Sequence, residues 1–316
     1  MANLFYRREK SLSRVGLGKS ERIPVIVDND PNLGYEKTNW WYFLMIPFIL
    51  LLAFYVALKK KILGPKLKIN TFWFDGVSKK CREIKENAAQ WRALDIIYNY
   101  QWGNENLFTD FWLDIRNAQA VRNRSKLIKY LLLKNIEEIS KKNNEIKLIS
   151  LASGSAQGVI ETVKRVKEKG ILVKAILIDL DPTAIEHSKK LVENLEIKNQ
   201  FTFINKTASI INEIGREFKP HLIEMVGFLE YRPFDKAVKL INSIYQILES
   251  EGIFLVSQIA PNFESFFLKT VINWPMIYRK PHELIKIISL AGFPLENCSF
   301  YWEPLKIHFI IEGKKI

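Results

Sequence analysis

The chain has 316 residues, of which 48% are hydrophobic, and this is enough for one full-sized α/β domain with additional segments. A net charge of +13 is compatible with a nucleic acid, an anionic membrane face, an acidic substrate or simply a lysine-rich surface. Two cysteines far apart and four scattered histidines argue against a disulfide framework and against a structural metal site.

The first part of the chain predicts a flexible tail followed by a membrane helix. Residues 1–38 are polar and contain no long apolar pattern. Residues 39–58 contain no charge, and about twenty such residues match the length of a helix that crosses a bilayer. Trp40 and Trp41 would lie at one interface and Lys59 at the other. The alternatives are a buried core helix or a signal peptide, but no cleavage site stands out before the lysines.

The lysines predict the orientation of this segment. Five of them follow it within ten residues, whereas only Lys37 lies close before it. Because positive residues stay on the cytoplasmic side, we expect the C-terminal part in the cytoplasm and the tail outside, joined by a single span.

Residues 59–145 read as a basic juxtamembrane segment and a helical cap. Apolar residues recur at helical spacing over 88–98, 110–124 and 127–132. Arg122 and Arg124 lie in one of these helices, and two residues so spaced cannot share a helix face. At most one of them therefore points at a pocket, and we favour Arg122 as a contact for a cofactor or an acidic substrate.

From residue 146 the pattern alternates between strands and helices. Strands are expected at about 146–151, 171–179, 200–205, 221–226 and 252–258, with helices between them. This alternation predicts a parallel sheet covered on both faces. Two further strands, 299–302 and 307–311, are joined by four residues, which only an antiparallel hairpin allows. The fold class is therefore α/β, a doubly wound, mostly parallel seven-stranded sheet with a terminal antiparallel hairpin, preceded by a transmembrane helix and a helical cap.

The strongest functional signal lies at residues 147–158, where a buried strand runs into a turn of small residues. A turn of that kind lets the backbone approach a ligand closely. The next strand ends in Asp179, and an acid at that place can hold the two hydroxyls of a ribose. Asp181 stands just before Pro182 and is expected to cap the following helix. Together these residues predict a pocket for a nucleoside-containing cofactor.

Residues 146–316 resemble the class I S-adenosylmethionine-dependent methyltransferases in this turn, in the strand tip at Asp179 and in the terminal hairpin. In the family's loop pattern Ser150 stands at the acid, Ala152, Gly154 and Ala156 at the three glycines, so only Gly154 matches. The resemblance implies S-adenosyl-L-methionine as the cofactor. It implies that the methionine part lies against Ala152, Ser153 and Gly154, the ribose against Asp179, and the adenine against Leu180 and Ala208.

The acceptor would bind beyond the carboxyl ends of the strands. Glu224, Glu230 and Tyr231 are candidate bases or acceptor-orienting groups, needed only if the acceptor must lose a proton. Arg122, Asn262, Tyr278 and Arg279 are candidate substrate contacts, and an arginine there could hold a carboxylate or phosphate. A solvated carboxylate, wall tyrosines and a surface arginine are the plainer interpretations of the same residues.

These observations favour a membrane-anchored methyltransferase that acts on a small or lipid-like molecule. A nucleic-acid methyltransferase is the alternative in the same class, supported by the charge but not by any base-methylation signature, and no specific nucleic-acid partner is expected. A non-catalytic cofactor-binding scaffold is the alternative from another class, because Ser150, Ala152 and Ala156 depart from the family pattern. A nicotinamide oxidoreductase is disfavoured by the terminal hairpin.

Overall fold

The computed structural model describes residues 14–16 and 22–316, and it divides the chain into two units. We call the first the sheet unit; it consists of Met1–Tyr35, Arg124–Ala260 and Ile277–Ile316. We call the second the helical unit; it consists of Glu36–Asn123 and Pro261–Met276. The predicted boundary at residue 145 does not coincide with this division, which falls inside one helix, α5 (Arg116–Ser140).

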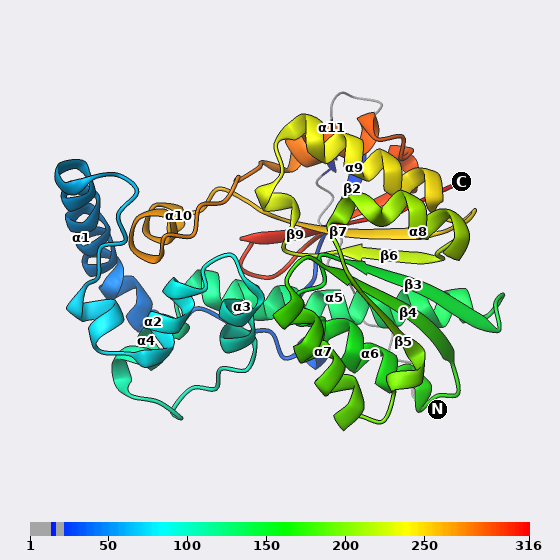
Figure 1. Cartoon of the computed structure of the whole chain (residues 1–316). Coiled ribbons are helices and arrows are strands. Elements are labelled where there is room, and N and C mark those ends of the chain that lie inside the picture. The colour runs from blue at the N-terminus through cyan, green and yellow to red at the C-terminus, as the bar shows by residue number, and fades with distance from the viewer. Residues whose placement is uncertain (1–13, 17–21) are drawn as a thin grey trace. The chain divides into compact units, whose positions relative to one another are not determined.

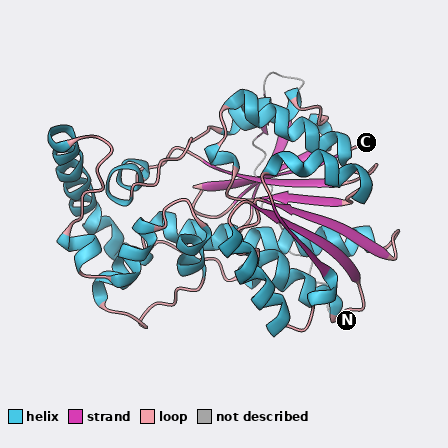
Figure 2. Ribbon diagram, in the orientation of Figure 1, coloured by secondary structure: helices cyan, strands magenta, loops and turns pink. Residues whose placement is uncertain are grey.

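The sheet unit contains one nine-stranded sheet in the order β1-β2-β8-β9-β7-β6-β3-β4-β5. The five strands from β7 to the edge strand β5 are parallel, and β9 is antiparallel to both β7 and β8. Figure 2 shows the strands of this sheet in magenta. The predicted parallel sheet with its antiparallel hairpin is therefore confirmed. The strands are β1 (Arg14–Gly16), β2 (Arg22–Val27), β3 (Glu145–Leu151), β4 (Leu172–Asp179), β5 (Phe201–Asn205), β6 (Leu222–Met225), β7 (Ile253–Ile259), β8 (Cys298–Trp302) and β9 (His308–Lys314).

Two strands were not expected, and they correct the predicted tail. β2 pairs in parallel with β8, and β1 pairs antiparallel with β2. Val25 and Ile26 are buried in the hydrophobic cores on opposite faces of the sheet. The run contains Pro24, which has no N–H to donate to a neighbouring strand and so argues against a strand in the sequence alone. The open edge of β8 supplies its partner. Residues 1–13 and 17–21, where the rest of that prediction falls, lie outside the described residues.

Helices cover both faces of the sheet, as expected for a doubly wound fold (Figure 1). One core lies under α8 (Ile211–Phe218), α9 (Phe234–Ile247) and α11 (Pro281–Leu290). The other lies under α5, α6 (Gln157–Lys167) and α7 (Pro182–Asn194). The carboxyl ends of the parallel strands remain outside these two layers, where ligands bind in such folds.

The helical unit is built around aromatic side chains. Trp112 stacks on Phe267 with ring centroids 5.0 Å apart, and Phe74 meets Trp112 edge-on at 5.3 Å. The unit's elements are α1 (Trp40–Leu63), η2 (Phe72–Gly76), α2 (Lys79–Glu86), α3 (Trp91–Tyr98), α4 (Leu107–Leu113), the start of α5, α10 (Ser265–Phe267) and η6 (Leu268–Ile272). The predicted helical cap is thus helical, with α1 as part of the same unit.

Among the described residues, α1 is the one helix long and apolar enough to cross a membrane, a finding of length and composition only. The predicted topology, however, disagrees with the sheet. β2 precedes α1 and β8 follows it, yet the two strands are hydrogen-bonded neighbours. A helix that crosses once leaves its two flanks on opposite sides of the bilayer, so a single span with residues 22–27 outside is incompatible with this pairing.

Candidate functional site

The turn after β3 has the backbone conformation of a glycine loop although two of its key residues are alanines. Ala152, Gly154 and Ala156 have φ values of +54°, +55° and +49°. L-residues other than glycine rarely adopt this left-handed region, because Cβ crowds the following carbonyl. The three positions are those at which the resembling family has glycine. The loop therefore keeps the geometry of the motif with only one of its three glycines, Gly154.

Asp179, the last residue of β4, fixes this loop. Its Oδ2 accepts a hydrogen bond from the backbone N–H of Gly154 at 2.7 Å, and its Oδ1 accepts one from Asp181 at 2.8 Å. A carboxylate oxygen has two acceptor positions, so both oxygens can still accept a hydroxyl. Asp181 accepts a bond from the N–H of Thr183 at 2.8 Å at the start of α7, which confirms the predicted cap.

The neighbouring residues also fit an adenosine-containing cofactor. Leu180 is 66% exposed directly after Asp179, where an apolar side chain can cover a purine ring. Ala208 begins the short helix after β5. Asn205 donates to the backbone carbonyls of Asp179 and Leu180 at 3.0 and 2.9 Å. In the loop, the buried Ser153 Oγ has no hydrogen-bond partner within the described chain, so it can bond a ligand. The residues present therefore match the expected cofactor.

A second polar group lies deeper at the same edge of the sheet. Glu224 in β6 accepts a hydrogen bond from the Ser150 hydroxyl of β3, its neighbour in register. Both lie two residues beyond buried leucines, Leu148 and Leu222, in the core under α5, and alternation puts them on that face. Burial raises the pKa of Glu224 to about 7, against the lowering effects of Ser150 and the Arg124 charge. Glu224 therefore changes its protonation state near neutral pH.

Arg124 of α5 is the buried cation of this group. Its Nη1 lies 3.7 Å from Oε1 of Glu230, and both side chains are almost fully buried. Burial raises the pKa of Glu230, while the charge of Arg124 lowers it in part. The burial of Glu230 excludes the alternative interpretation of this residue as a solvated carboxylate. Buried ions need partners of this kind, because each loses several kcal/mol of hydration.

His308 completes the group. It begins β9 and pairs in register with Ile259, the last residue of β7, so it lies at the carboxyl edge of the parallel strands. The side chain is buried, and neither ring nitrogen has a hydrogen-bond partner within the described chain. Burial and the Arg124 charge lower its pKa well below the usual value, so the ring is neutral at pH 7. We call five residues together the buried charge cluster: Arg124, Ser150, Glu224, Glu230 and His308.

Arg279 does not have the geometry of a substrate contact. The side chain is buried and donates to the carbonyl of Leu229 at 3.0 Å, to Gln258 Oε1 at 2.8 Å and to the carbonyl of Arg232. These bonds attach the segment before α11 to β7 and to the loop after β6. Arg279 is therefore assigned to the fold, which corrects its predicted role.

The two candidate tyrosines remain near this region as partly buried residues. Tyr231 ends the short helix Leu229–Tyr231 that carries Glu230, and Tyr278 directly precedes Arg279. Both belong to the sheet unit. Their positions are compatible with walls of a site and with the predicted roles alike.

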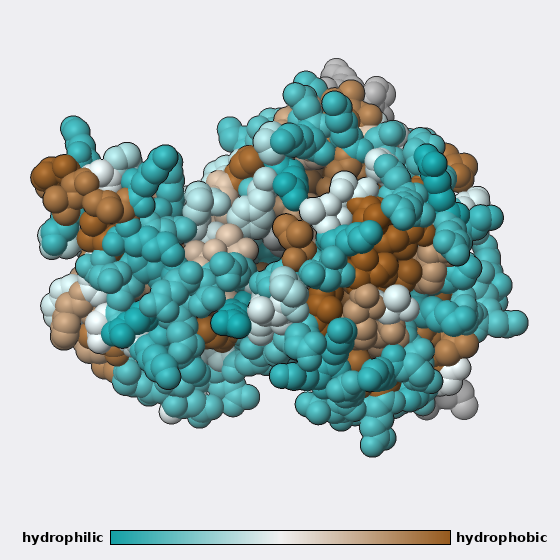
Figure 3. Space-filling model, in the orientation of Figure 1, coloured by the Kyte–Doolittle hydropathy of each residue, from teal (hydrophilic) through white to brown (hydrophobic). Residues whose placement is uncertain are grey.

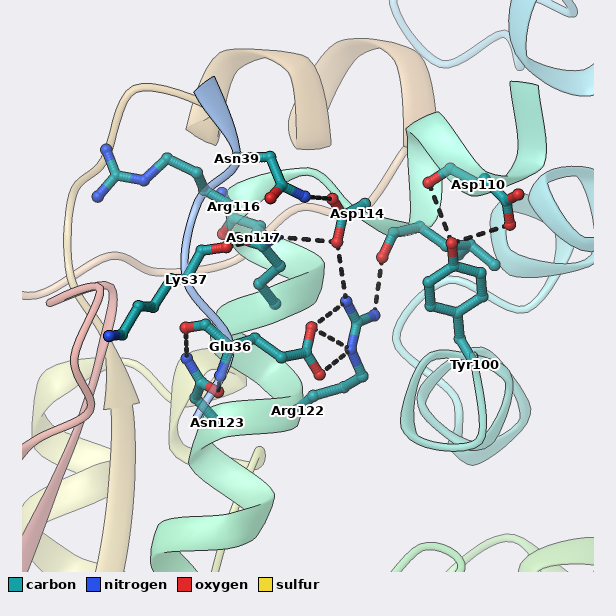
Figure 4. A network of polar contacts seen from close by, with 12 residues as sticks. Glu36, Lys37, Asn39, Tyr100, Asp110, Asp114, Arg116, Asn117, Arg122 and Asn123 are labelled. Atoms are coloured by element: carbon teal, nitrogen blue, oxygen red, sulfur yellow. Dashed lines mark hydrogen bonds and ion pairs between the residues drawn. The ribbon is translucent and has the colours of Figure 1, made fainter. Parts of the chain in front are cut away.

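Arg122 and Asn262 lie in the helical unit and bond within it. Figure 4 shows Arg122 bonded to Glu36. Arg122 Nε donates to both carboxylate oxygens of Glu36 at 2.7 and 2.9 Å, and Nη1 donates to the carbonyl of Leu113 at 2.7 Å. Asn262 Oδ1 accepts from Asn117 Nδ2 at 2.9 Å and from the Glu264 N–H at 3.0 Å. Both side chains therefore hold the unit together, and Arg124 is the arginine that lies beside Glu230. The preference for Arg122 as the site arginine stays a prediction.

Sequence reasoning missed Arg124 and His308. For Arg124, helical periodicity alone does not decide whether it or Arg122 faces the sheet. His308 stands two residues before the buried Ile310 of β9, and strand alternation puts both on the same face. That spacing was a usable signal for a histidine at the ligand edge.

The comparisons with known proteins agree with this architecture. Residues 88–295, more than half of the chain, match the sequence profile of the family described as "Putative methyltransferase". No curated protein matches the chain. A solved structure of a possible exported protein from Bordetella parapertussis has a TM-score of 0.62 at 12% identity, covering 91% of this chain and 99% of its own.

Magnesium protoporphyrin IX methyltransferase from Synechocystis PCC 6803, solved with bound SAH, has a TM-score of 0.51 at 14% identity. The match covers 72% of this chain and 92% of that protein. At such identities these likenesses show a shared fold and nothing more. The profile match is what decides the family: the chain belongs to this family of methyltransferases.

Proposed function

We propose that this protein is an S-adenosylmethionine-dependent methyltransferase that transfers a methyl group to a small or lipid-like acceptor. The observation that carries the proposal is the loop at residues 152–156, which keeps three left-handed residues and is bonded to Asp179. A strained loop of this kind persists only where the surrounding structure fixes it, and such strain concentrates at ligand sites. Membership of a methyltransferase family supports the same reading.

Each part of the cofactor has a candidate contact. The backbone of Ala152, Ser153 and Gly154 would lie against its methionine part, and Asp179 would accept bonds from the ribose hydroxyls. Leu180 and Ala208 would lie against the adenine. When bound, the cofactor supplies a methyl group already activated by a positively charged sulfur. The chain then has to align the acceptor in line with that methyl and keep water out.

Where the acceptor must lose a proton, Glu224 is the group that accepts it. Its pKa of about 7 lets it accept a proton near neutral pH, and it is hydrogen-bonded to Ser150. Glu230 faces Arg124, so its role is to hold that cation close to Glu224. Tyr231, partly exposed beside Glu230, is the remaining candidate for orienting the acceptor.

The lipid-like class of acceptor is proposed from α1. Its length of 24 residues and its apolar composition favour contact with a membrane, where such acceptors concentrate. The site is then expected on the cytoplasmic side, where S-adenosylmethionine is made. Figure 3 shows apolar residues gathered on the surface at the position of α1.

Calorimetry of the full chain with S-adenosylmethionine and its demethylated product tests the cofactor. We expect both to bind with micromolar dissociation constants, a free energy of about −8 kcal/mol. Incubation with methyl-labelled cofactor and separated lipid, metabolite and nucleic-acid fractions then tests the acceptor. Label in the lipid or metabolite fraction supports the proposal, and label in nucleic acid would establish the alternative. Binding without any transfer would leave a non-catalytic scaffold, and no binding would reject all three.

A further inference from the structure

One side of α1 packs into the helical unit and the other side is both apolar and exposed. The buried side consists of Tyr42, Ile49, Leu52, Ala53 and Val56. The exposed side carries large apolar residues at helical spacing: Leu44 is 67%, Leu51 68%, Phe54 64%, Leu58 49% and Ile62 74% exposed. A helix that is apolar all round needs apolar surroundings on every side. The helical unit supplies apolar surroundings to the buried side of α1 only.

Exposed aromatic residues extend this surface beyond the helix. Phe48 of α1 meets Trp73 edge-on at 6.0 Å, and Trp73 meets Phe72 at 5.4 Å and Phe108 at 6.1 Å. Phe72 is 68%, Trp73 46% and Phe108 41% exposed. We define the apolar face of the helical unit as the exposed residues of α1 just given together with Phe72, Trp73 and Phe108. Apolar patches of this kind on one protein mark an interaction surface.

The charges beside the apolar face match an anionic lipid surface. Lys61, Lys66 and Lys68 are exposed within and just beyond the last turn of α1. Basic residues next to an apolar surface attract anionic headgroups, and tryptophan prefers the headgroup level. A second copy of this chain would present the same lysines, and like charges would oppose its docking.

Both ends of α1 are attached to folded protein on one side of any bilayer. Before it, β2 belongs to the same sheet as β8. At its start, Asn39 Nδ2 donates to Asp114 Oδ2 at 2.9 Å, and near its end Lys60 bonds Asn273, all within the helical unit. A helix that crosses once would put β2 and β8 on opposite sides of the hydrocarbon layer, which is about 30 Å thick, although they are paired.

We propose that the apolar face docks on an anionic lipid bilayer with α1 lying in the plane of one leaflet, so that it does not cross. This rests on the membrane contact in the proposed function, and it replaces the single span predicted from the sequence. Helices that lie in the interface bury one apolar side in the acyl boundary and keep the other side on protein.

Flotation of the full-length protein with vesicles tests the surface. The probe is phosphatidylcholine with and without phosphatidylserine. We expect binding that strengthens with phosphatidylserine, and a loss of about tenfold or more in the Leu51→Asp and Phe54→Asp variants, because a carboxylate is costly in the acyl region. Leu290→Asp is the matched control, since Leu290 is 56% exposed on the sheet unit, and it should bind as the parent does. Unchanged binding in both α1 variants, or a stable dimer that ignores lipid, would overturn the proposal.

Cysteine labelling in sealed membrane vesicles from cells making the full chain tests the topology. The native Cys81 and Cys298 are buried, so Asn29→Cys before α1 and Lys66→Cys after it provide the exposed thiols. An impermeant maleimide should label both positions or neither, whereas labelling of only one would establish a span. Calorimetry with the demethylated cofactor on the same samples separates the two proposals. If the protein floats with vesicles but does not bind the cofactor, methyl transfer is rejected and the membrane-docking proposal is retained.

Discussion

The loop at residues 152–156 and the buried charge cluster lie at the same edge of one sheet, yet they depend on the sequence in opposite ways. In the loop the glycines of the motif are partly gone, but the left-handed backbone remains at Ala152 and Ala156. In the buried charge cluster the residue types can be seen in the sequence, but the contacts between them cannot. Their pairing arises only when α5 is laid over β3 and β6.

This difference separates local from tertiary determinants of a site. The loop is fixed within one strand–helix–strand unit, by bonds such as that from Gly154 to Asp179 at the tip of the adjacent strand. The cluster is fixed by burial, which makes each of its charges dependent on the others. We therefore expect substitutions in the cluster to have the larger effects on stability, and substitutions in the loop to act mainly on the cofactor.

The largest effect is expected from Arg124→Ala. It leaves Glu230 buried without its cation and removes the charge that helps keep Glu224 ionised. Removing one partner of a buried ion pair costs about 3–5 kcal/mol of unfolding free energy. Arg122→Ala should cost less, because the carboxylate of its partner Glu36 is 28% exposed and can be hydrated. Urea denaturation of both variants measures the difference, and a larger loss for Arg122→Ala would contradict the described cluster.

A pH-dependent effect is expected from Glu224→Gln. The folded pKa of Glu224, about 7, lies above the ordinary value of 4.5, so the folded protein holds a proton that the unfolded chain releases. Stability from this group is complete below pH 4.5 and is lost as the pH rises through 7, by about 3 kcal/mol in total. The variant has no such proton. Relative to the parent, its free energy of unfolding should therefore rise between pH 5 and pH 8.

Urea titrations of parent and variant at four pH values between 5 and 8 measure this difference. Gln246→Glu on the partly exposed end of α9 serves as a control that changes a charge away from the cluster. A difference between parent and Glu224→Gln that stays constant with pH would mean that Glu224 does not titrate in this range.

The sequence was sufficient for most of the sheet and for the loop, because both leave local signals. Strand alternation placed the strand at Glu145–Leu151 and the hairpin correctly, and the small residues marked the turn. The sequence does not reveal β2, because its six residues form a strand only by pairing with the open edge of β8. It also could not choose between Arg122 and Arg124, since the helix continues from one unit into the other and a periodic pattern does not say which face meets which partner.

Asp179→Asn tests the loop edge. The amide keeps one acceptor oxygen but loses the charge that would bond the ribose hydroxyls, and bonds to a charged group contribute about 1.5–3 kcal/mol each. We expect cofactor affinity to fall about thirtyfold to a hundredfold. Asp181→Asn is the control, since asparagine caps a helix as well as aspartate does, and affinity should be unchanged. Equal losses in the two variants would show that both act through α7 and that Asp179 does not bind the cofactor.

The smallest effect is expected from Ala152→Gly, and its sign is what matters. At a φ of +54°, alanine carries a steric cost of about 1–2 kcal/mol that glycine does not. Glycine also makes the unfolded chain more flexible, which offsets about 0.4–1 kcal/mol of that gain. The variant should therefore be more stable by up to about 1.6 kcal/mol and should still bind the cofactor. Ala184→Gly, inside α7, is the opposite control and should lose at least about 1 kcal/mol. If Ala152→Gly destabilised the protein as Ala184→Gly does, the residue would not be left-handed, and the loop would lose its likeness to a glycine loop.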